Sequence, residues 1–248
     1  MQEAKNYKET VKKLYSKISS FDDQNYIYSL RNPVGFYQRM IVLKGLIEIL
    51  NRNNNIKLSE FNSILDLGCG VGYWLRVIAE IRGNAEGLIG IDLSEERLNY
   101  AKKINKNIKW IKADICNLPF EDESFDFVTA FVSLMFLTDN KSLKRGVKEL
   151  ARVLRNGGMS LFYDVLGKRK LSGFTRGFQI KKVKDLFDST GLKLVDKQSC
   201  FKNIFGLRRL NTAYLASKIP MEILFLLEKL YFSKPNNVFL LFLKENKL

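Results

Sequence analysis

Apolar and polar positions along the chain follow two alternating patterns. Short apolar runs, bounded by glycine, asparagine or acidic residues, are separated by longer stretches in which apolar residues recur every three or four positions. The first pattern is typical of buried strands and the second of amphipathic helices. The predicted strands, in chain order, are 64–67, 88–91, 108–113, 125–132, 159–163, 192–195 and 238–243.

Helical stretches precede the first predicted strand and connect most of the others. They lie at 36–50, 73–81, 94–104, 143–154 and 183–187, and residues 1–30 are typical of one or two short polar helices. Strands that alternate with helices at this spacing form a parallel sheet covered on both faces. The pattern therefore predicts an α/β fold with a doubly wound, seven-stranded, mostly parallel sheet of Rossmann-like type.

We expect one domain over residues 1–248. Its parts are a helical cap at 1–60, a ligand-binding core at 61–199, a helical insertion at 200–236 and a last strand within 237–248. The asparagine-rich turn at 51–55 and Gly83-Asn84 end predicted helices, whereas Asn156-Gly157-Gly158 is expected to end the helix at 143–154.

The stretch from Ser63 to Trp74 joins the first strand to the next helix through a turn with three glycines at alternate positions. Glycine has no Cβ, so this turn can adopt positive φ and a ligand can lie against bare backbone. The N-terminus of the following helix offers unpaired N–H groups to a negative group. We therefore expect a ligand with an anionic end at this turn.

An acid follows or ends each of the first three predicted strands. These acids are Asp66, Asp92 and Asp114, and the carboxyl ends of parallel strands meet at one edge of the sheet, so they should line one cleft. A carboxylate at the position of Asp92 can bridge the two hydroxyls of a ribose. Dinucleotide sites require a later third glycine, where this chain has Tyr73, which argues against a nicotinamide or flavin cofactor.

The net charge of +15 is unevenly distributed along the chain. It is +4 over residues 1–62, zero over 63–164 and +11 over 165–248. A basic surface attracts phosphates or anionic lipid headgroups, so nucleic acid and peripheral membrane contact enter as alternative partners. A solvated lysine-rich face explains the same charge without any partner.

The spacing of the cysteines argues against two common kinds of cysteine site, a zinc site and a disulfide framework. Cys69, Cys116 and Cys200 are far apart, form no CxxC pair and are accompanied by no histidine, so neither a zinc site nor a disulfide framework is expected. The polar N-terminus lacks an apolar signal core, and the apolar run at 219–232 is short and interrupted by charges. The expected location is a reducing cytoplasm.

Several ordered motifs between about Ser63 and Gly191 resemble those of the class I S-adenosylmethionine-dependent methyltransferases, particularly the small-molecule type. The matching segments are Leu65-Asp66-Leu67-Gly68-Cys69-Gly70-Val71-Gly72, Gly90-Ile91-Asp92-Leu93-Ser94, Ala113-Asp114-Ile115-Cys116-Asn117-Leu118-Pro119-Phe120, Ser124-Phe125-Asp126-Phe127-Val128, and Glu149-Leu150-Ala151-Arg152-Val153-Leu154-Arg155-Asn156-Gly157-Gly158. Residues 1–60 and 200–236 fall outside this resemblance.

The resemblance implies S-adenosylmethionine as cofactor and S-adenosylhomocysteine as its product. The backbone of Gly68, Cys69, Gly70 and Gly72 would then cradle the methionine end, with Asp66 near its amino group. The backbone around Phe131 would close the same side. The glycine turn would therefore face a carboxylate instead of a phosphate.

The other end of the cofactor is implied to lie along the next two strands. Asp92 would hold the ribose hydroxyls and Leu93 would lie against the adenine. Asp114 would accept from the adenine amino group, and the Ile115 backbone N–H would meet a ring nitrogen. An ammonium, a diol and an aromatic base together call for carboxylates and an apolar slot.

Methyl transfer needs a general base only when the acceptor atom still carries its proton. Many relatives have a histidine after the fourth strand, but this chain has Phe136 in that region and no histidine anywhere. The candidate base is Asp164 at the end of the fifth strand, with Tyr163 second, and a loop-capping role is the alternative for Asp164. Tyr28, Tyr37 and Arg39 on the cap are candidates for acceptor contact.

The interpretation is an enzyme that moves a methyl group from S-adenosylmethionine to oxygen or nitrogen of a small molecule. No Pro-Cys pair for attack on pyrimidine carbon is present, and the amino-methyltransferase motif Asn/Asp-Pro-Pro-Tyr/Phe is absent after strand four. The alternatives are an RNA methyltransferase that uses the basic C-terminal third, and a non-catalytic cofactor-binding protein with a partner or membrane surface. The insertion at 200–236 would be a substrate lid, a membrane contact or packed core.

Overall fold

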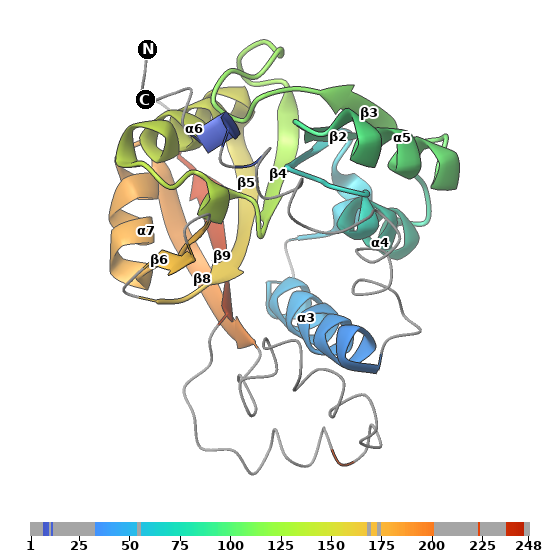
Figure 1. Cartoon of the computed structure of the whole chain (residues 1–248), viewed down its shortest axis with the longest axis horizontal. Coiled ribbons are helices and arrows are strands. Elements are labelled where there is room, and N and C mark those ends of the chain that lie inside the picture. The colour runs from blue at the N-terminus through green and yellow to red at the C-terminus, as the bar shows by residue number, and fades with distance from the viewer. Residues whose placement is uncertain are drawn as a thin grey trace.

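A computed structural model of the chain describes residues 7–9, 11, 33–53, 56–167, 170–172, 175–200, 223 and 237–245 (Figure 1). The expectations for the polar helices of 1–30 fall mostly outside these residues, as do Tyr28 and almost all of the insertion at 200–236. The described residues contain the whole central sheet and the helices that pack on it.

The sheet has seven strands in the order β3-β2-β1-β4-β5-β9-β8, which confirms the doubly wound fold. β1 to β5 are parallel to one another, and β9 is antiparallel to both of its neighbours. The strands are β1 (Ile64–Leu67), β2 (Leu88–Asp92), β3 (Lys109–Lys112), β4 (Phe125–Phe131), β5 (Leu154–Val165), β8 (Leu192–Cys200) and β9 (Asn237–Lys244).

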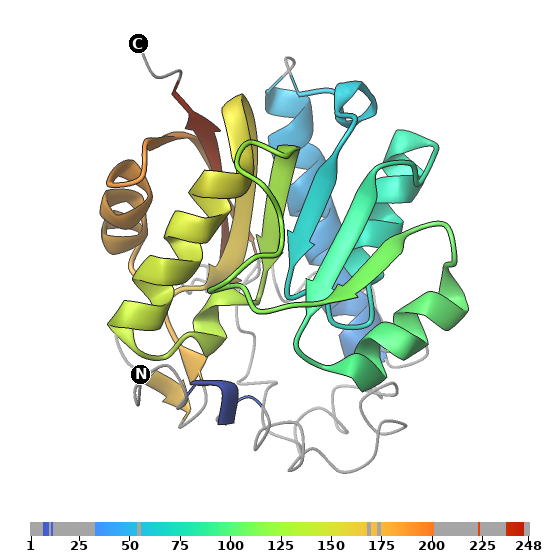
Figure 2. The same ribbon diagram turned by 90° about the horizontal axis from the view of Figure 1, so that it is seen from above.

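Helices cover both faces of the sheet (Figure 2). They are α3 (Pro33–Arg52), α4 (Tyr73–Arg82), α5 (Glu95–Ile104), α6 (Asn140–Val153) and α7 (Ile180–Asp188), with 3-10 turns η1 (Leu58–Glu60) and η2 (Leu134–Phe136). One buried cluster joins α6 and α7 to the sheet, and a second joins α3 and α4 to the opposite face. Adjacent strand residues point to opposite clusters, Leu240 to the first and Leu241 to the second, because side chains alternate along a strand.

The fifth strand begins earlier than the sequence predicts. Asn156-Gly157-Gly158 does not end a helix, because α6 stops at Val153 and Leu154 already pairs with Phe125 of β4. The register then shifts between Phe125 and Phe127, which lets the glycine-containing segment continue as strand. A glycine pair that signals a loop in the sequence is here an irregularity inside a paired strand.

Two other elements differ from the prediction. The sixth strand of the sheet, β8, extends to Cys200, because β9 pairs with it along its whole length. A short antiparallel hairpin, β6 (Lys170–Ser172) and β7 (Thr175–Arg176), follows β5 and has no counterpart in the predicted pattern. Both features depend on pairing between segments, which local periodicity does not report.

Candidate functional site

The glycine turn between β1 and α4 adopts the positive-φ backbone that its sequence predicts. Gly68, Gly70 and Gly72 have φ values of 72°, 55° and 73°, all in the left-handed region that favours glycine. Gly72 is the N-cap of α4, so the turn leads directly into the N-terminal end of that helix. The first N–H groups of α4 therefore face the carboxyl edge of the sheet.

Two of these glycines are also required by close packing. A Cβ on Gly68 would lie 2.6 Å from the Ser133 Cβ, and one on Gly72 would lie 2.2 Å from the Trp110 ring. At Gly70 a Cβ would meet only the Arg97 Nη1, at 3.6 Å. The turn is thus walled by Ser133 and Trp110 and has room beside Gly70, where a ligand can approach the backbone.

Asp92 links the glycine turn to the next helix. Its Oδ2 accepts from the Gly70 N–H at 2.9 Å and its Oδ1 from the Ser94 N–H at 2.8 Å. Ser94 caps α5, because its Oγ accepts from the Arg97 N–H. Burial raises the pKa of Asp92, although the two backbone donors oppose that shift. The two backbone donors hold the carboxylate in one orientation at the carboxyl edge of the sheet.

Asp66 is the most buried of the three acids, with an exposed fraction of 1%. Its Oδ1 accepts from the Thr129 Oγ1 at 2.8 Å. Burial raises the pKa of Asp66 to about 7, the Thr129 hydrogen bond opposes this, and the charge of Asp92 adds to it. A buried acid beside a second acid is stabilised by a cation, so this corner of the site fits an ammonium group.

Asp114 makes contacts that the sequence analysis did not foresee. Its carboxylate accepts from the Tyr7 hydroxyl, from the Lys8 Nζ at 2.5 Å and from the Cys116 N–H at 2.8 Å. Burial alone would raise the pKa of Asp114, but the Lys8 and Tyr7 hydrogen bonds hold it below its usual value. Tyr7 and Val11 are buried, so this N-terminal turn, blue beside α6 in Figure 1, packs onto the site.

No sequence signal marked Tyr7 and Lys8 as site residues, because they lie 107 and 106 positions before Asp114. Burial also raises the pKa of the Tyr7 hydroxyl, and the Asp114 hydrogen bond strengthens the effect. The phenol therefore stays protonated and donates. The nearby Cys116 thiol has a pKa raised to about 11, mainly by burial, which keeps it an unreactive thiol.

Ser133 supplies an independent indication of a ligand. Its Oγ is buried and has no hydrogen-bond partner in the described part of the chain, and its Cβ forms the wall of the glycine turn. Buried hydroxyls are normally paired, so an orphaned one beside an open turn indicates a missing partner. The open turn, the two buried acids and this hydroxyl fit the polar amino-acid end and the ribose of S-adenosylmethionine.

The remaining predicted cofactor residues lie around the same edge. Leu93 and Ile115 are partly buried and pack against the sheet cluster. Phe131 is buried and meets the Trp74 ring edge to face at a centroid distance of 5.3 Å. Cys69 donates its backbone N–H to the Ile91 carbonyl at 2.8 Å, and burial raises the pKa of its thiol. These residues contribute packing and backbone geometry.

Asp164 occupies a position that favours the capping role over the general base. It is completely buried, its Oδ2 accepts from the Met135 N–H at 3.1 Å, and its Oδ1 accepts from the Val165 N–H at 2.8 Å. The carboxylate therefore holds η2 against the end of β5. Tyr163 is also buried, and its ring packs against that of Phe239 in a tilted arrangement.

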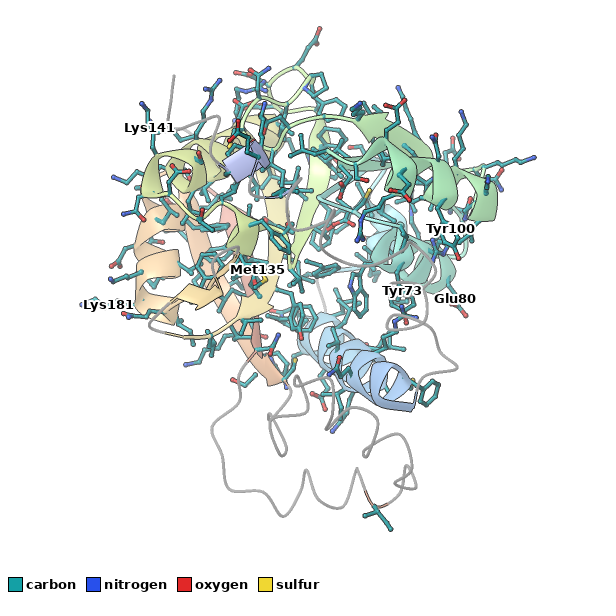
Figure 3. The ribbon with its side chains drawn as sticks, viewed as in Figure 1. Tyr73, Glu80, Tyr100, Met135, Lys141 and Lys181 are labelled. Atoms are coloured by element: carbon teal, nitrogen blue, oxygen red, sulfur yellow. The ribbon has the colours of Figure 1, made fainter. Side chains whose placement is uncertain are left out.

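Of the candidate acceptor residues, only Arg39 has a described side chain. Its guanidinium carbon lies 4.1 Å from the centre of the Tyr73 ring, a cation–π geometry that joins α3 to the start of α4. Figure 3 shows Tyr73 at the end of α4 that faces α3. Tyr28 and the Tyr37 side chain lie outside the described residues.

Other kinds of site are not found in the described ranges. The Cys, Asp and Glu side chains of residues 33–53, 56–167 and the shorter described segments form no group that could hold a metal ion. The helices that the structure describes include none long and apolar enough to cross a membrane.

Comparisons with known proteins bear on this geometry. Residues 64–158 match a family described as a methyltransferase domain. A demethylmenaquinone methyltransferase from Staphylococcus carnosus is 28% identical over 73% of this chain and 70% of its own length. The enzyme of the same name from Staphylococcus saprophyticus is 33% identical over 64% of each chain. That matched region thus spans slightly less than two thirds of the second relative.

Solved structures show the same fold at low sequence identity. A methyltransferase from Methanosarcina mazei has a TM-score of 0.57 at 17% identity and covers 79% of this chain and 98% of its own. One from Mesorhizobium loti has a TM-score of 0.56 at 17% identity, covering 80% and 97%. With the motifs, the glycine turn and the strand-end acids at one edge, these matches identify a methyltransferase domain at residues 64–158 and support a class I S-adenosylmethionine-dependent methyltransferase.

Proposed function

We propose that this protein transfers a methyl group from S-adenosylmethionine to oxygen or nitrogen of a small-molecule acceptor. The observation that carries the proposal is that Asp66 and Asp92 lie beside the open turn at Gly70, with the orphaned Ser133 hydroxyl next to Gly68 in the same turn. Each group matches a polar part of the cofactor, and the match of residues 64–158 to a methyltransferase domain supports the reaction type.

The residues of the cleft would divide the cofactor between them. Asp66 would face the ammonium and Asp92 the ribose diol, while Asp114, already oriented by Tyr7 and Lys8, would accept from the adenine amino group. When bound, the cofactor supplies an electrophilic methyl on a sulfonium. The protein contributes alignment and water exclusion, which are the main requirements of an in-line transfer.

The acceptor is proposed to be an apolar small molecule with a hydroxylated ring. The two named relatives are demethylmenaquinone methyltransferases, so quinone-like rings are the class that similarity favours. The described residues near η2 and β5 are mostly apolar, which suits such a ring. The acceptor atom itself is part of the proposal.

Calorimetry with S-adenosylhomocysteine tests the cofactor assignment. We expect micromolar binding by the wild-type chain and a loss of at least tenfold in Asp92→Ala, because the ribose diol loses its charged acceptor. Gly70→Val should also lose binding, because the new side chain would occupy the open turn. Full binding in both variants, or no binding by a folded wild-type chain, would contradict the proposal. Binding without turnover on any acceptor would favour the non-catalytic alternative.

A further inference from the structure

The N-terminal turn that contains Tyr7, Lys8 and Val11 reaches the carboxyl edge of the sheet at one acid, Asp114. Tyr7 and Val11 are buried in the same cluster as Cys116. The Tyr7 hydroxyl donates to Asp114 Oδ1, and the Lys8 Nζ lies 2.5 Å from Asp114 Oδ2. One turn, anchored by two buried side chains, therefore brings a neutral donor and a cation to the same carboxylate.

The chain after β3 holds this carboxylate as well. The Cys116 N–H donates to Asp114 Oδ1 at 2.8 Å, and the Asn117 N–H donates to the Asp114 carbonyl at 2.9 Å. An ionised carboxylate has about four acceptor positions. The Tyr7 hydroxyl, the Lys8 ammonium and the Cys116 N–H occupy three of them, which leaves one position on Oδ2.

The remaining acceptor position can be reached from outside the protein. The Asp114 side chain keeps an exposed fraction of 15%, and that of Lys8 on the same oxygen is 46%. Tyr7, by contrast, is only 3% exposed. A ligand can therefore approach Oδ2 beside Lys8, while the Tyr7 hydrogen bond stays shielded.

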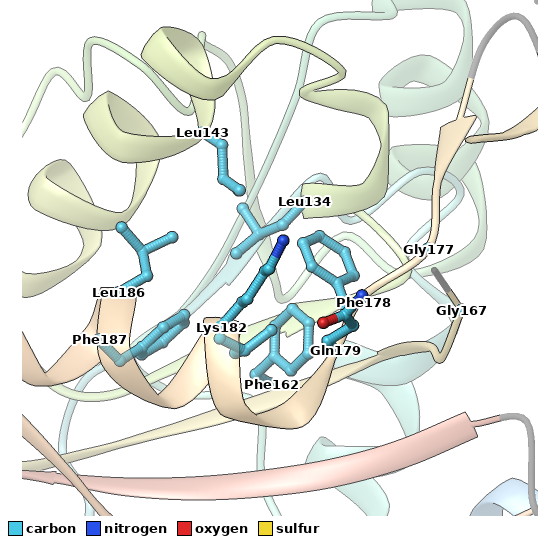
Figure 4. A pocket seen from close by; sticks show the side chains of 11 residues that line it. Leu134, Leu143, Phe162, Gly167, Gly177, Phe178, Gln179, Lys182, Leu186 and Phe187 are labelled. Carbon is cyan, nitrogen blue, oxygen red and sulfur yellow. The ribbon is translucent and has the colours of Figure 1, made fainter. Parts of the chain in front are cut away.

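Other features near this acid do not supply the contact. Asp139, the N-cap of α6, raises the pKa of the Cys116 thiol, and Arg145 on α6 lowers it, so their effects oppose each other. The cavity behind η2, between α6 and α7, is lined by neither Asp114 nor the N-terminal turn (Figure 4). The donors on Asp114 thus form a separate arrangement.

These donors decide which partner the remaining position accepts. An ionised carboxylate only accepts hydrogen bonds, whereas a protonated one also donates. Burial favours the protonated form of Asp114, and the hydrogen bonds from Lys8 and Tyr7 oppose it by stabilising the charge. With both donors in place, Asp114 favours a purine with a 6-amino group over one with a 6-oxo group.

We propose that Tyr7 and Lys8 are positioning residues for the purine of the methyl donor, and that they hold Asp114 as a fixed, purely accepting carboxylate that selects a 6-amino over a 6-oxo purine. This inference rests on the proposed function, because it concerns the cofactor end of the same site. Neither residue touches the reacting atoms. Both act on donor binding through Asp114.

Calorimetry on the whole chain with S-adenosylhomocysteine and S-inosylhomocysteine tests this selection. The two probes differ at the purine 6 position and share the amino-acid end, so the contribution of Asp66 cancels from the ratio of their affinities. We expect the wild-type chain to favour S-adenosylhomocysteine at least about a hundredfold, because the 6-oxo group would face an acceptor. That ratio should stay constant between pH 5 and 8, because the pKa of Asp114 lies below its usual value.

The Tyr7→Phe/Lys8→Met double variant should lose this constancy. Without the two donors, burial raises the pKa of Asp114, so the carboxyl begins to take up a proton as the pH falls. We expect the affinity ratio to fall about threefold or more from pH 8 to pH 5. The ¹³C carboxyl resonance of Asp114 in the ligand-free chain gives a second readout, and its titration midpoint should rise.

Two single variants serve as controls. Lys8→Arg should keep the wild-type ratio and its flat pH profile, because a guanidinium retains the ion pair. Lys112→Met removes the exposed pair with Glu95 and one positive charge, and it should leave both readouts unchanged.

Equal binding of the two probes by the wild-type chain would overturn the inference and leave the proposed function intact. So would a double variant in which either the affinity ratio or the Asp114 midpoint stays at the wild-type value. A folded wild-type chain that binds neither probe would refute the proposed function and the purine selection together.

Discussion

At the scale of single residues, the ionised form of Asp66 is unusually unfavourable in the folded chain, and the ammonium of the proposed cofactor would stabilise it. The carboxylate is fully buried and has a pKa raised to about 7 from 3.8, so ionising it in the folded chain without a cation is unfavourable. A shift of that size corresponds to about 4 kcal/mol. A buried carboxylate whose ionisation is this unfavourable fits a site in which a bound ammonium stabilises the charge.

The stability of the ligand-free protein should therefore fall as the pH rises. Because the folded pKa of Asp66 lies above the unfolded value, the folded state holds the extra proton between about pH 4 and 7, and the free energy of unfolding decreases across that window. Asp66→Asn should remove this component, which urea unfolding at several pH values measures. An unchanged pH dependence in the variant would show that other groups dominate.

Cofactor binding should show the opposite pH dependence. The ammonium favours the ionised carboxylate, so the affinity for S-adenosylhomocysteine should rise about tenfold from pH 6 to 8, with a proton released at the lower pH. Thr129→Val removes the hydrogen bond that lowers the pKa of Asp66, so the midpoint of this rise should move to higher pH. Calorimetry in buffers of different ionisation enthalpy measures the released proton. A midpoint that stays in place would argue against Asp66 as the titrating group.

At the scale of elements, the turn between β1 and α4 depends on both backbone conformation and space. Gly68 combines a φ of 72° with a Cβ position 2.6 Å from the Ser133 Cβ, whereas Gly83 at the end of α4 has a φ of 82° and open space around it. The pair therefore separates the cost of strain from the cost of overpacking. Gly68 precedes α4 and Gly83 is its C-cap, so the two positions lie at opposite ends of the same helix.

Gly68→Ala should destabilise the fold more than Gly83→Ala. We expect a loss of about 1 kcal/mol for Gly83→Ala from the left-handed backbone alone, and about 1–3 kcal/mol more for Gly68→Ala from overpacking. Urea unfolding gives both values. Equal losses would mean that η2 and Ser133 move aside without cost, which would weaken the view of a rigid wall at the turn.

The N-terminal turn is a second element whose position depends on one carboxylate. In Asp114→Asn, Lys8 loses its ion pair and Tyr7 keeps only a neutral acceptor, so hydrogen exchange at the amides of residues 7–9 should speed up about tenfold. Glu95→Gln, which removes the exposed pair with Lys112, should leave these amides unchanged. Unchanged exchange in Asp114→Asn would mean that burial of Tyr7 and Val11 alone holds the turn.

At the scale of the whole molecule, α3 closes the face of the sheet opposite α6 and α7. It lies across β8 and β9, with Leu46 and Ile49 in the same buried cluster as Phe239. Gly45 makes this close approach, because a Cβ there would lie 2.2 Å from the Cys200 Sγ. Arg52 fixes the end of the helix through its ion pair with Asp196.

A double-mutant cycle measures this contact. Gly45→Ala should destabilise the wild-type chain by about 1–2 kcal/mol, because overpacking against Cys200 exceeds the gain in helix propensity. In a Cys200→Ala background the Sγ is absent, so the same substitution should become neutral or stabilising by up to about 1 kcal/mol. Additive effects would indicate that α3 sits further from β8.

The sequence alone determined the order of the elements and the edge of the sheet at which the strand-end acids lie. Apolar runs located every strand of the main sheet, because buried strands and amphipathic helices have different periods. Glycines at alternate positions and strand-end acids indicated the candidate site, because parallel strands end at one edge and the Gly70 N–H donates to Asp92 there. These features are local or follow from topology.

Only the tertiary structure decided the features that require contact between segments far apart in the sequence. It brought Tyr7 and Lys8 to Asp114, turned Asp164 onto the Met135 N–H, and made the glycine pair at Gly157 and Gly158 part of a paired strand. It also created the cavity behind η2, whose walls come from four separate stretches of chain. Packing and long-range hydrogen bonds fix these arrangements, and neither produces a periodic pattern of apolar residues in the sequence.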